Sequence, residues 1–212
     1  MPDTDKSLII DDSILFDSSE YILEECYLTP YRGDKNFKDL EFLMKFIKTK
    51  QPKNIIEIGT AVGNTTANIC RTLPDAHVFT VCALPEQISG HHITSAFQKK
   101  DIGKIYRKYG YDKQITQIYE NTLDLDLRKY VKNIKFDLAI IDACHDADYV
   151  VNDFYKIVDH LNENAVVLFH DTSPSMEGHL YTSYLGCLRL IKDGYNIEYV
   201  PETWYAIWVN NQ

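Results

Sequence analysis

Two apolar runs of the sequence each end in histidine and aspartate. The first run reads FDLAIIDACHD and the second reads AVVLFHD. The polar side chains at their ends are Asp142, His145, Asp146, His170 and Asp171. An imidazole can take up a proton at neutral pH, and carboxylates together with imidazoles can hold a divalent cation. The two ends therefore predict proton transfer, metal binding or both.

A pair of glycines after an earlier apolar run is the second chemical signal. Residues 54–66 read NIIEIGTAVGNTT, so that Glu57 comes shortly before Gly59, and Gly63 stands where a helix would begin. Glycine lets the backbone approach a ligand, and the first N–H groups of a helix point to the same place. This pattern predicts a site for a nucleotide-containing cofactor. It differs from the Gly-x-Gly-x-x-Gly of dinucleotide-binding folds because Ala61 replaces the middle glycine.

Short apolar runs alternate with helical patterns from residue 54 onward, which is typical of βαβ units around a parallel sheet. The fourth and fifth strands are nearly continuous apolar runs and belong at the centre of the sheet. The last two strands, joined through Pro-Glu-Thr, should form a hairpin that adds an antiparallel strand. Ligands bind beyond the carboxyl ends of strands in such sheets, so the polar residues above should meet at one edge. The strands are expected near 54–58, 77–82, 115–119, 136–142, 164–170, 195–200 and 204–209.

Apolar residues at helical spacing predict helices that cover the sheet. One such set extends from Val150 to Leu161, and a later helix should stop at Gly194. Residues 1–50 differ from the rest and are interpreted as an N-terminal helical cap on a main domain of residues 51–212. The apolar positions of the later helix are Tyr184, Cys187, Leu188 and Ile191, and those of the last helix of the cap are Leu40, Leu43, Met44 and Ile47.

Charge and cysteine content narrow the classes of function. Lys and Arg total 22 against 31 Asp and Glu, which gives a net charge of −9 and makes nucleic acid a poor partner. The five cysteines form no Cys-x-x-Cys pair, which is typical of reduced thiols in a cytoplasmic protein. No apolar run approaches the roughly 20 residues that span a bilayer. We therefore expect a soluble, cytoplasmic protein with no membrane partner.

The segment EIGTAVG resembles motif I of the class I S-adenosylmethionine (SAM) methyltransferases, and EIGT…G is similar to the form found in their O-methyltransferase branch. The resemblance covers roughly residues 50–209. It implies a Rossmann-like α/β fold with a seven-stranded sheet, mostly parallel with an antiparallel C-terminal hairpin strand, and helices on both faces. It also implies SAM as the cofactor.

The resemblance assigns residues to that cofactor. Glu57 would reach its ammonium group, and Asn121 would face the adenine amino group. Cys82 departs from the family pattern, which has Asp or Glu there to accept hydrogen bonds from the ribose hydroxyls, because a thiol accepts poorly. The cofactor contacts implied in this way are Glu57, Gly59, Thr60, Ala61, Gly63, Thr65, Cys82, Asn121, Thr122 and Asp142.

Two interpretations of the strand ends remain open. IDACHD and FHDT resemble an O-methyltransferase subgroup with Ile-Asp-Gly-x-His and Phe-His-Asp, which makes Asp142, His145 and His170 catalytic, with His145 as the general base. The catechol-type O-methyltransferases hold a divalent ion at these strand ends, which would make Asp142, His170 and Asp171 its ligands. The carboxylates suit Mg²⁺, whereas the imidazole favours Mn²⁺, Fe²⁺ or Zn²⁺.

The resemblance implies SN2 transfer of a methyl group from SAM to a hydroxyl of a small molecule such as a phenol, sugar or secondary metabolite. In the family, N-terminal helices often cover the substrate or form a dimer contact, so Tyr27, Tyr31 and Arg32 are candidate substrate contacts and a homodimer fits this segment. Two other classes of function compete with this interpretation. Cys82 also suits a non-catalytic member of the fold that acts as a binding or scaffold module. An NAD(P)-dependent oxidoreductase would need the dinucleotide glycine pattern and a ribose-binding acid, and the sequence has neither.

Overall fold

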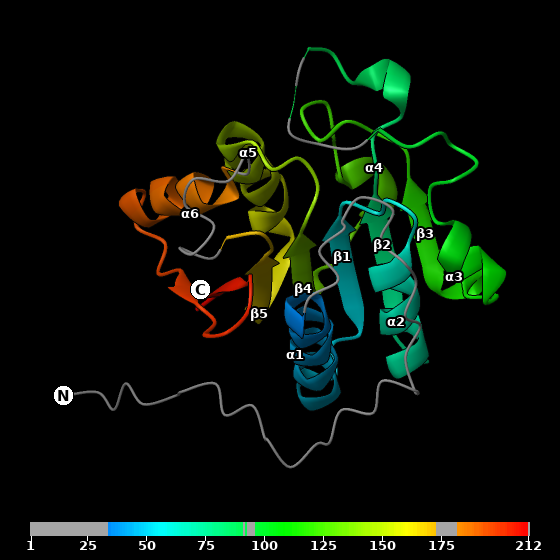
Figure 1. The fold of residues 1–212 in the computed structure, drawn as a ribbon, viewed down its shortest axis with the longest axis horizontal. Helices are drawn as coiled ribbons and strands as arrows, with labels where there is room; N and C mark the ends of the chain where they lie inside the picture. Colours follow the sequence, from blue (N-terminus) through cyan, green and yellow to red (C-terminus); the bar gives the residue numbers. More distant parts are fainter. Residues whose placement is uncertain (1–33, 91, 93–95, 173–181, 212) are drawn as a thin grey trace.

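The computed structural model describes residues 34–90, 92, 96–172 and 182–211 (Figure 1). The candidate substrate contacts Tyr27, Tyr31 and Arg32 lie outside the described residues.

A seven-stranded sheet forms the middle layer of the fold (Figure 1). The strand order is β3-β2-β1-β4-β5-β7-β6, so that β4 and β5 are central as predicted. The first five strands are parallel, and β7 runs antiparallel to both β5 and β6. The predicted seven strands and the C-terminal hairpin are confirmed. The strands are β1 (Asn54–Ile58), β2 (His77–Val81), β3 (Ile115–Ile118), β4 (Phe136–Ile141), β5 (Leu161–Phe169), β6 (Glu198–Tyr199) and β7 (Ala206–Val209).

Helices cover both faces of the sheet (Figure 1). The described α-helices are α1 (Asp34–Lys50), α2 (Asn64–Thr72), α3 (Lys104–Lys108), α4 (Arg128–Val131), α5 (Ala147–Ile157) and α6 (Ser183–Lys192). Short 3₁₀ turns are η2 (Pro85–Gln87), η3 (Asp112–Gln114) and η4 (Val158–His160). Among the described residues, no helix is both long and apolar enough to cross a membrane.

Side chains alternate along each strand, so each face of the sheet builds its own core. Ile56 and Ile58 of β1 point to one face, where they share a hydrophobic cluster with Phe154 of α5 and Leu190 of α6. Ile55 points to the other face and shares a cluster with α1 and α2. The strongly apolar central strands are therefore covered on both sides, as the sequence predicted.

Helix α1 packs directly on the sheet. Its predicted apolar positions Leu43, Met44 and Ile47 are fully buried, in the same cluster as Leu138 of β4 and Leu168 of β5. Leu40 is only partly buried and packs at the border of that cluster. The end of the proposed cap is thus continuous with the core of the main domain, and the division at residue 50 stays a prediction.

Two details of the helix prediction are wrong. Leu161 was predicted to lie on the helix that begins near Val150, but it is the first residue of β5. Helix α5 ends at Ile157, and η4 lies between α5 and β5. Ile191 of α6 is 38% exposed, because the buried stripe of that helix runs through Gly186 and Cys187. An added Cβ atom at Gly186 would lie 2.8 Å from the Cβ atom of Val150, so α5 and α6 approach each other at this glycine and Ile191 turns outward.

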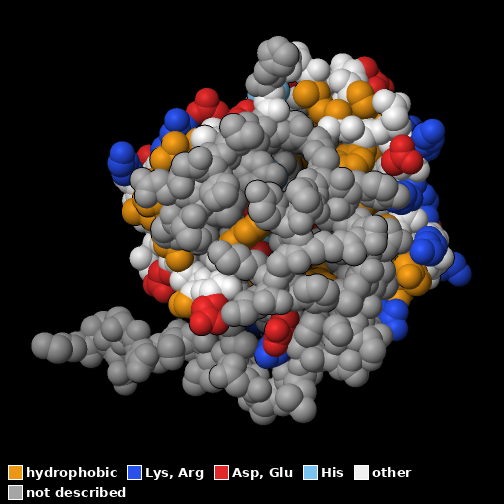
Figure 2. Space-filling model, in the orientation of Figure 1, with side chains coloured by type: hydrophobic (Ala, Val, Ile, Leu, Met, Phe, Trp, Pro, Cys, Tyr) orange, Lys and Arg blue, Asp and Glu red, His pale blue; other side chains and the backbone are white. Residues whose placement is uncertain are grey.

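Basic side chains gather on the side of the molecule that carries α3 (Figure 2). Lys99, Lys100, Lys108 and Lys113 are exposed there. The cation of Lys99 lies 4.8 Å from the centre of the Tyr119 ring, an arrangement that cation–π attraction favours.

Candidate functional site

The turn after β1, residues 59–63, lies against the end of β4. Gly59 has φ of +116°, and a Cβ atom added to it would lie 1.9 Å from the carbonyl oxygen of Asp142. The N–H groups of Gly59 and Thr60 both donate to the carbonyl of Val81, at 2.9 and 3.2 Å. The protein itself therefore requires glycine at position 59, and the turn touches the strand end that carries Asp142. We call residues 59–63, which the sequence predicts to contact a cofactor, the cofactor turn.

The second glycine of the turn makes room for a later segment of the chain. Gly63 has φ of +82°, and an added Cβ atom would lie 2.8 Å from both Gly103 Cα and Tyr106 Cδ1. Gly103 N–H donates to the carbonyl of Ala61 at 3.0 Å. Ala61 itself has φ of +46°, in the left-handed region that few residues other than glycine adopt. The segment that contains Gly103 and Tyr106 therefore packs against the cofactor turn, at the point where α2 begins.

Glu57 is a buried acid held by hydroxyl groups. Its side chain is 1% exposed, and its Oε2 accepts hydrogen bonds from Thr66 and Thr80, both at 2.5 Å. Burial raises the pKa of Glu57 to about 7, because the two hydrogen bonds only partly offset the loss of water. The carboxyl group is therefore partly protonated at neutral pH.

A row of polar residues crosses three strands at the level of Glu57. Thr80 of β2 is its partner in the sheet register, and Gln117 of β3 is the partner of Thr80. Thr80 lies 2.7 Å from the hydroxyl of Thr60, and Gln117 Nε2 donates to Thr60 at 2.9 Å. This row was not predicted from the sequence. Its signal was a polar residue one position before the end of each strand.

The other predicted cofactor contacts lie at the same edge and already have partners within the protein. Cys82 follows β2 and is partly buried, and burial raises the pKa of its thiol although the N–H groups of Ala61 and Thr60 point to the sulfur. Asn121 donates through Nδ2 to the carbonyl of Gln87 at 3.0 Å, and its Oδ1 accepts from the N–H of Leu123 at 3.0 Å.

Thr122 and Thr65 complete the predicted set. Thr122 is 7% exposed and donates to Asp153 of α5, a carboxyl group whose pKa burial raises to about 6. Thr65 is partly buried in the first turn of α2. Thr122 thus connects the segment after β3 to α5.

Four of the five predicted aspartates and histidines come together where β4 and β5 end, whereas Asp146 faces His92 instead. His170 Nδ1 lies 3.2 Å from Asp142 Oδ1 and 3.6 Å from Asp171 Oδ2. His145 Nε2 lies 3.2 Å from Asp171 Oδ2 and 3.6 Å from Asp142 Oδ1. Both imidazoles therefore face the same two carboxylate oxygens. Asp171 reaches them from an uncommon left-handed backbone conformation, with φ of +54°.

Asp39 of α1 is a fifth member that the sequence did not predict. Its Oδ2 lies 3.0 Å from His170 Nε2, and its Oδ1 accepts the N–H of Trp204 at 3.0 Å. We call Asp39, Asp142, His145, His170 and Asp171 the Asp/His cluster. Burial alone would lower the pKa of His170, but Asp142 and Asp171 hold it well above its usual value. Burial likewise opposes ionisation of Asp142, yet His170 and His145 hold its pKa well below the usual value.

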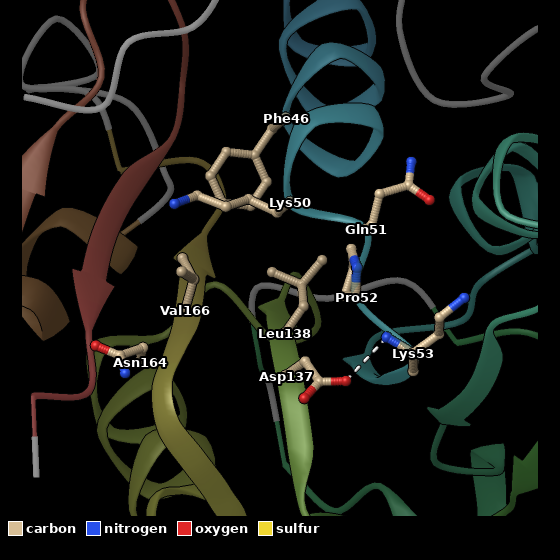
Figure 3. A pocket seen from close by; sticks show the side chains of 9 residues that line it. All are labelled: Phe46, Lys50, Gln51, Pro52, Lys53, Asp137, Leu138, Asn164 and Val166. Carbon is tan, nitrogen blue, oxygen red and sulfur yellow. Dashed lines mark hydrogen bonds between the residues drawn. The ribbon is translucent and has the colours of Figure 1, made fainter.

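The pocket in Figure 3 lies at the opposite edge of the sheet. It has a volume of about 240 Å³ and is lined by residues around the amino ends of β1 and β4, with Phe46 and Lys50 from α1. Its carboxylate, Asp137, accepts hydrogen bonds from the N–H groups of Lys53 and Asn54 at 2.8 and 2.9 Å. Asp137 therefore has a structural role, far from the cofactor turn.

Comparisons with known proteins agree with the overall fold. Solved structures with a similar fold include a Staphylococcus aureus protein assigned as a caffeoyl-CoA O-methyltransferase, with TM-score 0.62 and 18% identity, covering 91% of this chain and 87% of that chain. An O-methyltransferase from Bacillus cereus in complex with S-adenosylhomocysteine (SAH) has TM-score 0.60 and 17% identity, with 95% and 94% covered. The O-methyltransferase TomG from Streptomyces achromogenes, in complex with SAM, has TM-score 0.59 and 16% identity, with 82% and 80% covered.

A sequence family described as a methyltransferase domain matches residues 56–172, which begins inside β1 and ends just after Asp171. The match covers more than half of the 212 residues and contains the cofactor turn and all of the Asp/His cluster except Asp39. The chain therefore belongs to the methyltransferase domain family and has the class I, O-methyltransferase-like fold that its sequence predicted.

Proposed function

We propose that the protein is a SAM-dependent O-methyltransferase that acts on a hydroxyl group of a small molecule. The contact between the cofactor turn and Asp142 is the observation that carries this proposal. Because an added Cβ atom at Gly59 would overlap the carbonyl of Asp142, a cofactor held at the turn would lie beside the Asp/His cluster. The SAM and SAH complexes of similar fold support the choice of cofactor.

The residues of the turn would bind and orient SAM. Glu57 would interact with its ammonium group, and the backbone from Gly59 to Gly63 would pass under the methionine part and the ribose, with Thr60, Ala61 and Thr65 beside it. Asn121 and Thr122 would border the adenine. SAM supplies a methyl group with cationic character, so the remaining task is to align an acceptor oxygen and remove its proton.

The Asp/His cluster offers two ways to remove that proton. His145 could act as a base, or other members of the cluster could hold a divalent ion. If His145 Nε2 carries a proton and donates it to Asp171, the basic nitrogen is Nδ1, which is buried in this structure. A base at Nδ1 would need the loop after β4 to move. A divalent ion would need no such movement, because three potential ligand atoms from Asp142, His170 and Asp171 lie within 4.8 Å of one another.

The donor set fits a cation such as Mn²⁺, Fe²⁺ or Zn²⁺ better than Mg²⁺, because one of its three donors is an imidazole. Asp142, His170 and Asp171 would hold the ion, and its charge would favour loss of the proton from the acceptor hydroxyl. Asp39 would position His170 through Nε2. His145 would then hold Asp171 in place.

Calorimetry with SAM and SAH tests the cofactor assignment. We expect saturable binding of both compounds, and no binding up to millimolar ligand would refute the proposal. A methylation assay with a panel of phenols, sugars and other hydroxyl compounds then tests the acceptor class. Methylation of none of these hydroxyl compounds, alongside methylation of amines or thiols, would refute O-methylation.

Chelation separates the two routes for the proton. If a metal is required, treatment with EDTA should abolish activity and Mn²⁺ should restore it. Mn²⁺ should not restore activity in the Asp171→Asn protein. Asp159→Asn, at an exposed position, is the matched control. With His145 as the base, activity should survive EDTA, and His145→Ala should lose roughly 10²-fold or more in rate. His160→Ala, outside the cluster, is the control for that variant.

A non-catalytic binding module is the second candidate, and Cys82 favours it. A thiol at that position gives up the paired hydrogen bonds to a ribose, which would weaken cofactor binding. This candidate would be supported if the protein binds SAM but methylates no acceptor. The same assay must detect methylation by a related enzyme. The proposal also includes a cytoplasmic location, a homodimer and a separate N-terminal cap. Each of these can be checked by experiment.

A further inference from the structure

A second group of potential metal ligands lies beside the Asp/His cluster. His145 turns toward that cluster, whereas its neighbours in the sequence, Cys144 and Asp146, face His92. His92 Nδ1 lies 3.0 Å from Asp146 Oδ2, and Cys144 Sγ lies 3.6 Å from the same oxygen. The three atoms all lie within 4.8 Å of one another. Tetrahedral zinc with ordinary bond lengths places its ligand atoms roughly 3.3–3.6 Å apart, so these distances are close to what one ion needs.

The surroundings of His92 suit a metal ligand. Its Nε2 lies 2.6 Å from the carbonyl oxygen of Ser89, and its Nδ1 faces the carboxylate of Asp146. If Nε2 donates its proton to the carbonyl, the lone pair of Nδ1 points at a carboxylate oxygen. Two acceptors repel each other unless a cation lies between them, either a second ring proton or a metal ion. Histidines that bind metals usually donate their other N–H to a carbonyl or carboxylate, as His92 does.

The thiol and the access to the site complete the argument. Cys144 is 7% exposed, and burial raises the pKa of its thiol to about 12, so the group is not a reactive thiolate on its own. His92 and Asp146 are 25% and 27% exposed, which leaves a path for an ion from solvent. The ring of Tyr149 packs edge-on against His92 at 5.0 Å and holds the imidazole in place.

We propose that His92, Cys144 and Asp146 form a binding site for Zn²⁺. One imidazole nitrogen, one sulfur and one carboxylate oxygen would bind the ion, and a water molecule would take the fourth position. On binding, the Cys144 thiol releases its proton to solvent and a zinc–sulfur bond forms. The sulfur selects Zn²⁺ against Mg²⁺. The ion would connect the segment after η2 to the loop that carries His145. The zinc site is separate from the proposed methyl transfer and does not require it.

Cobalt reports on the sulfur ligand. The full-length protein, freed of metal by chelation, is titrated with Co²⁺, whose charge-transfer absorption in the near ultraviolet appears only with a thiolate ligand. We expect this band to reach the intensity of one thiolate-bound Co²⁺ per chain, whatever the Asp/His cluster binds, and to disappear when Zn²⁺ is added. Cys144→Ser and His92→Ala should lower the affinity for Zn²⁺ by about 100-fold or more. Cys82→Ser and Asp171→Asn are controls and should keep the band, because neither residue belongs to this site.

X-ray absorption at the zinc edge gives an independent result when it is measured on the Asp171→Asn protein, in which the Asp/His cluster lacks one of its three potential ligands. One sulfur neighbour at ~2.3 Å and lighter neighbours at ~2.0–2.1 Å are expected. The absence of a charge-transfer band, its persistence in Cys144→Ser, or a zinc shell of nitrogen and oxygen alone would overturn the proposal. Circular dichroism checks that the variants fold. His92→Ala lies outside the sheet and carries the test if Cys144→Ser does not fold.

Discussion

Glu57 makes a testable link between burial, pH and stability. Its pKa is about 7 in the folded protein and 4.5 in an ordinary environment, so the folded state favours the protonated form. The stabilising contribution of the protonated group is fully present below pH 4.5 and is lost as the pH rises through 7. We expect Glu57→Gln, which cannot ionise, to abolish this loss.

The size of the effect follows from the same two values. A gap of ~2.5 pKa units at ~1.36 kcal/mol each amounts to about 3 kcal/mol at pH 8, and to less than about 1 kcal/mol at pH 5. The glutamine oxygen can still accept hydrogen bonds from Thr66 and Thr80. Any cost of burying the amide N–H₂ group is the same at both pH values. The difference between pH 5 and pH 8 therefore isolates the ionisation of Glu57.

Urea unfolding of the ligand-free protein measures this difference. The free energy of unfolding of Glu57→Gln relative to the unchanged protein should rise by about 2–3 kcal/mol from pH 5 to pH 8. Glu163→Gln, at an exposed position of β5, is the control and should show no such change. SAM must be absent, because a bound ligand adds its own stabilisation. Equal differences at the two pH values would refute the assignment of a buried acid with a raised pKa.

Three further variants test other parts of the site and fold. Cys82→Asp should strengthen SAM binding by roughly one to two decades in calorimetry, because the N–H groups of Thr60 and Ala61 can hold the new carboxylate beside the ribose; unchanged affinity would place the ribose elsewhere. Asp39→Asn should lower the free energy of unfolding by about 1–3 kcal/mol in urea, because it removes a carboxylate from His170. Gly186→Ala should cost about 1–3 kcal/mol through the clash with Val150, and adding Val150→Ala should recover part of that loss; additive losses would contradict the close helix contact.

The sequence predicted the sheet well because the patterns that specify strands are local. Apolar runs, turn residues and the switch between two-residue and helical periods mark each strand and helix. The central position of β4 and β5 follows from their composition, since only strands covered on both faces can be apolar at every position. The outward turn of Ile191 depends instead on how closely α6 approaches α5 at Gly186, a tertiary contact.

The site was only partly predictable for a similar reason. Asp142, His145, His170 and Asp171 follow apolar strands, so the rule for strand ends found them. Asp39 lies 131 positions before His170, and no local pattern connects the two. Likewise the polar row through Glu57, Thr80 and Gln117 exists only in the register between strands, which the sequence does not specify. The long-range partners of the site therefore needed the structure.

Two acids of the site, Glu57 and Asp142, differ in the charge of their partners, and this difference bears on the cofactor. Threonine hydroxyls hold Glu57, and because hydroxyls bring no charge, burial dominates and its pKa rises. Imidazoles hold Asp142, and their positive charge lowers its pKa. Glu57, which comes directly before the cofactor turn in the sequence, is thus the acid of this pair without a cationic partner. A phosphate-bearing cofactor would be repelled by an ionised Glu57, whereas the ammonium and sulfonium groups of SAM would supply the missing positive charge. The electrostatics of the turn therefore favour SAM over a dinucleotide.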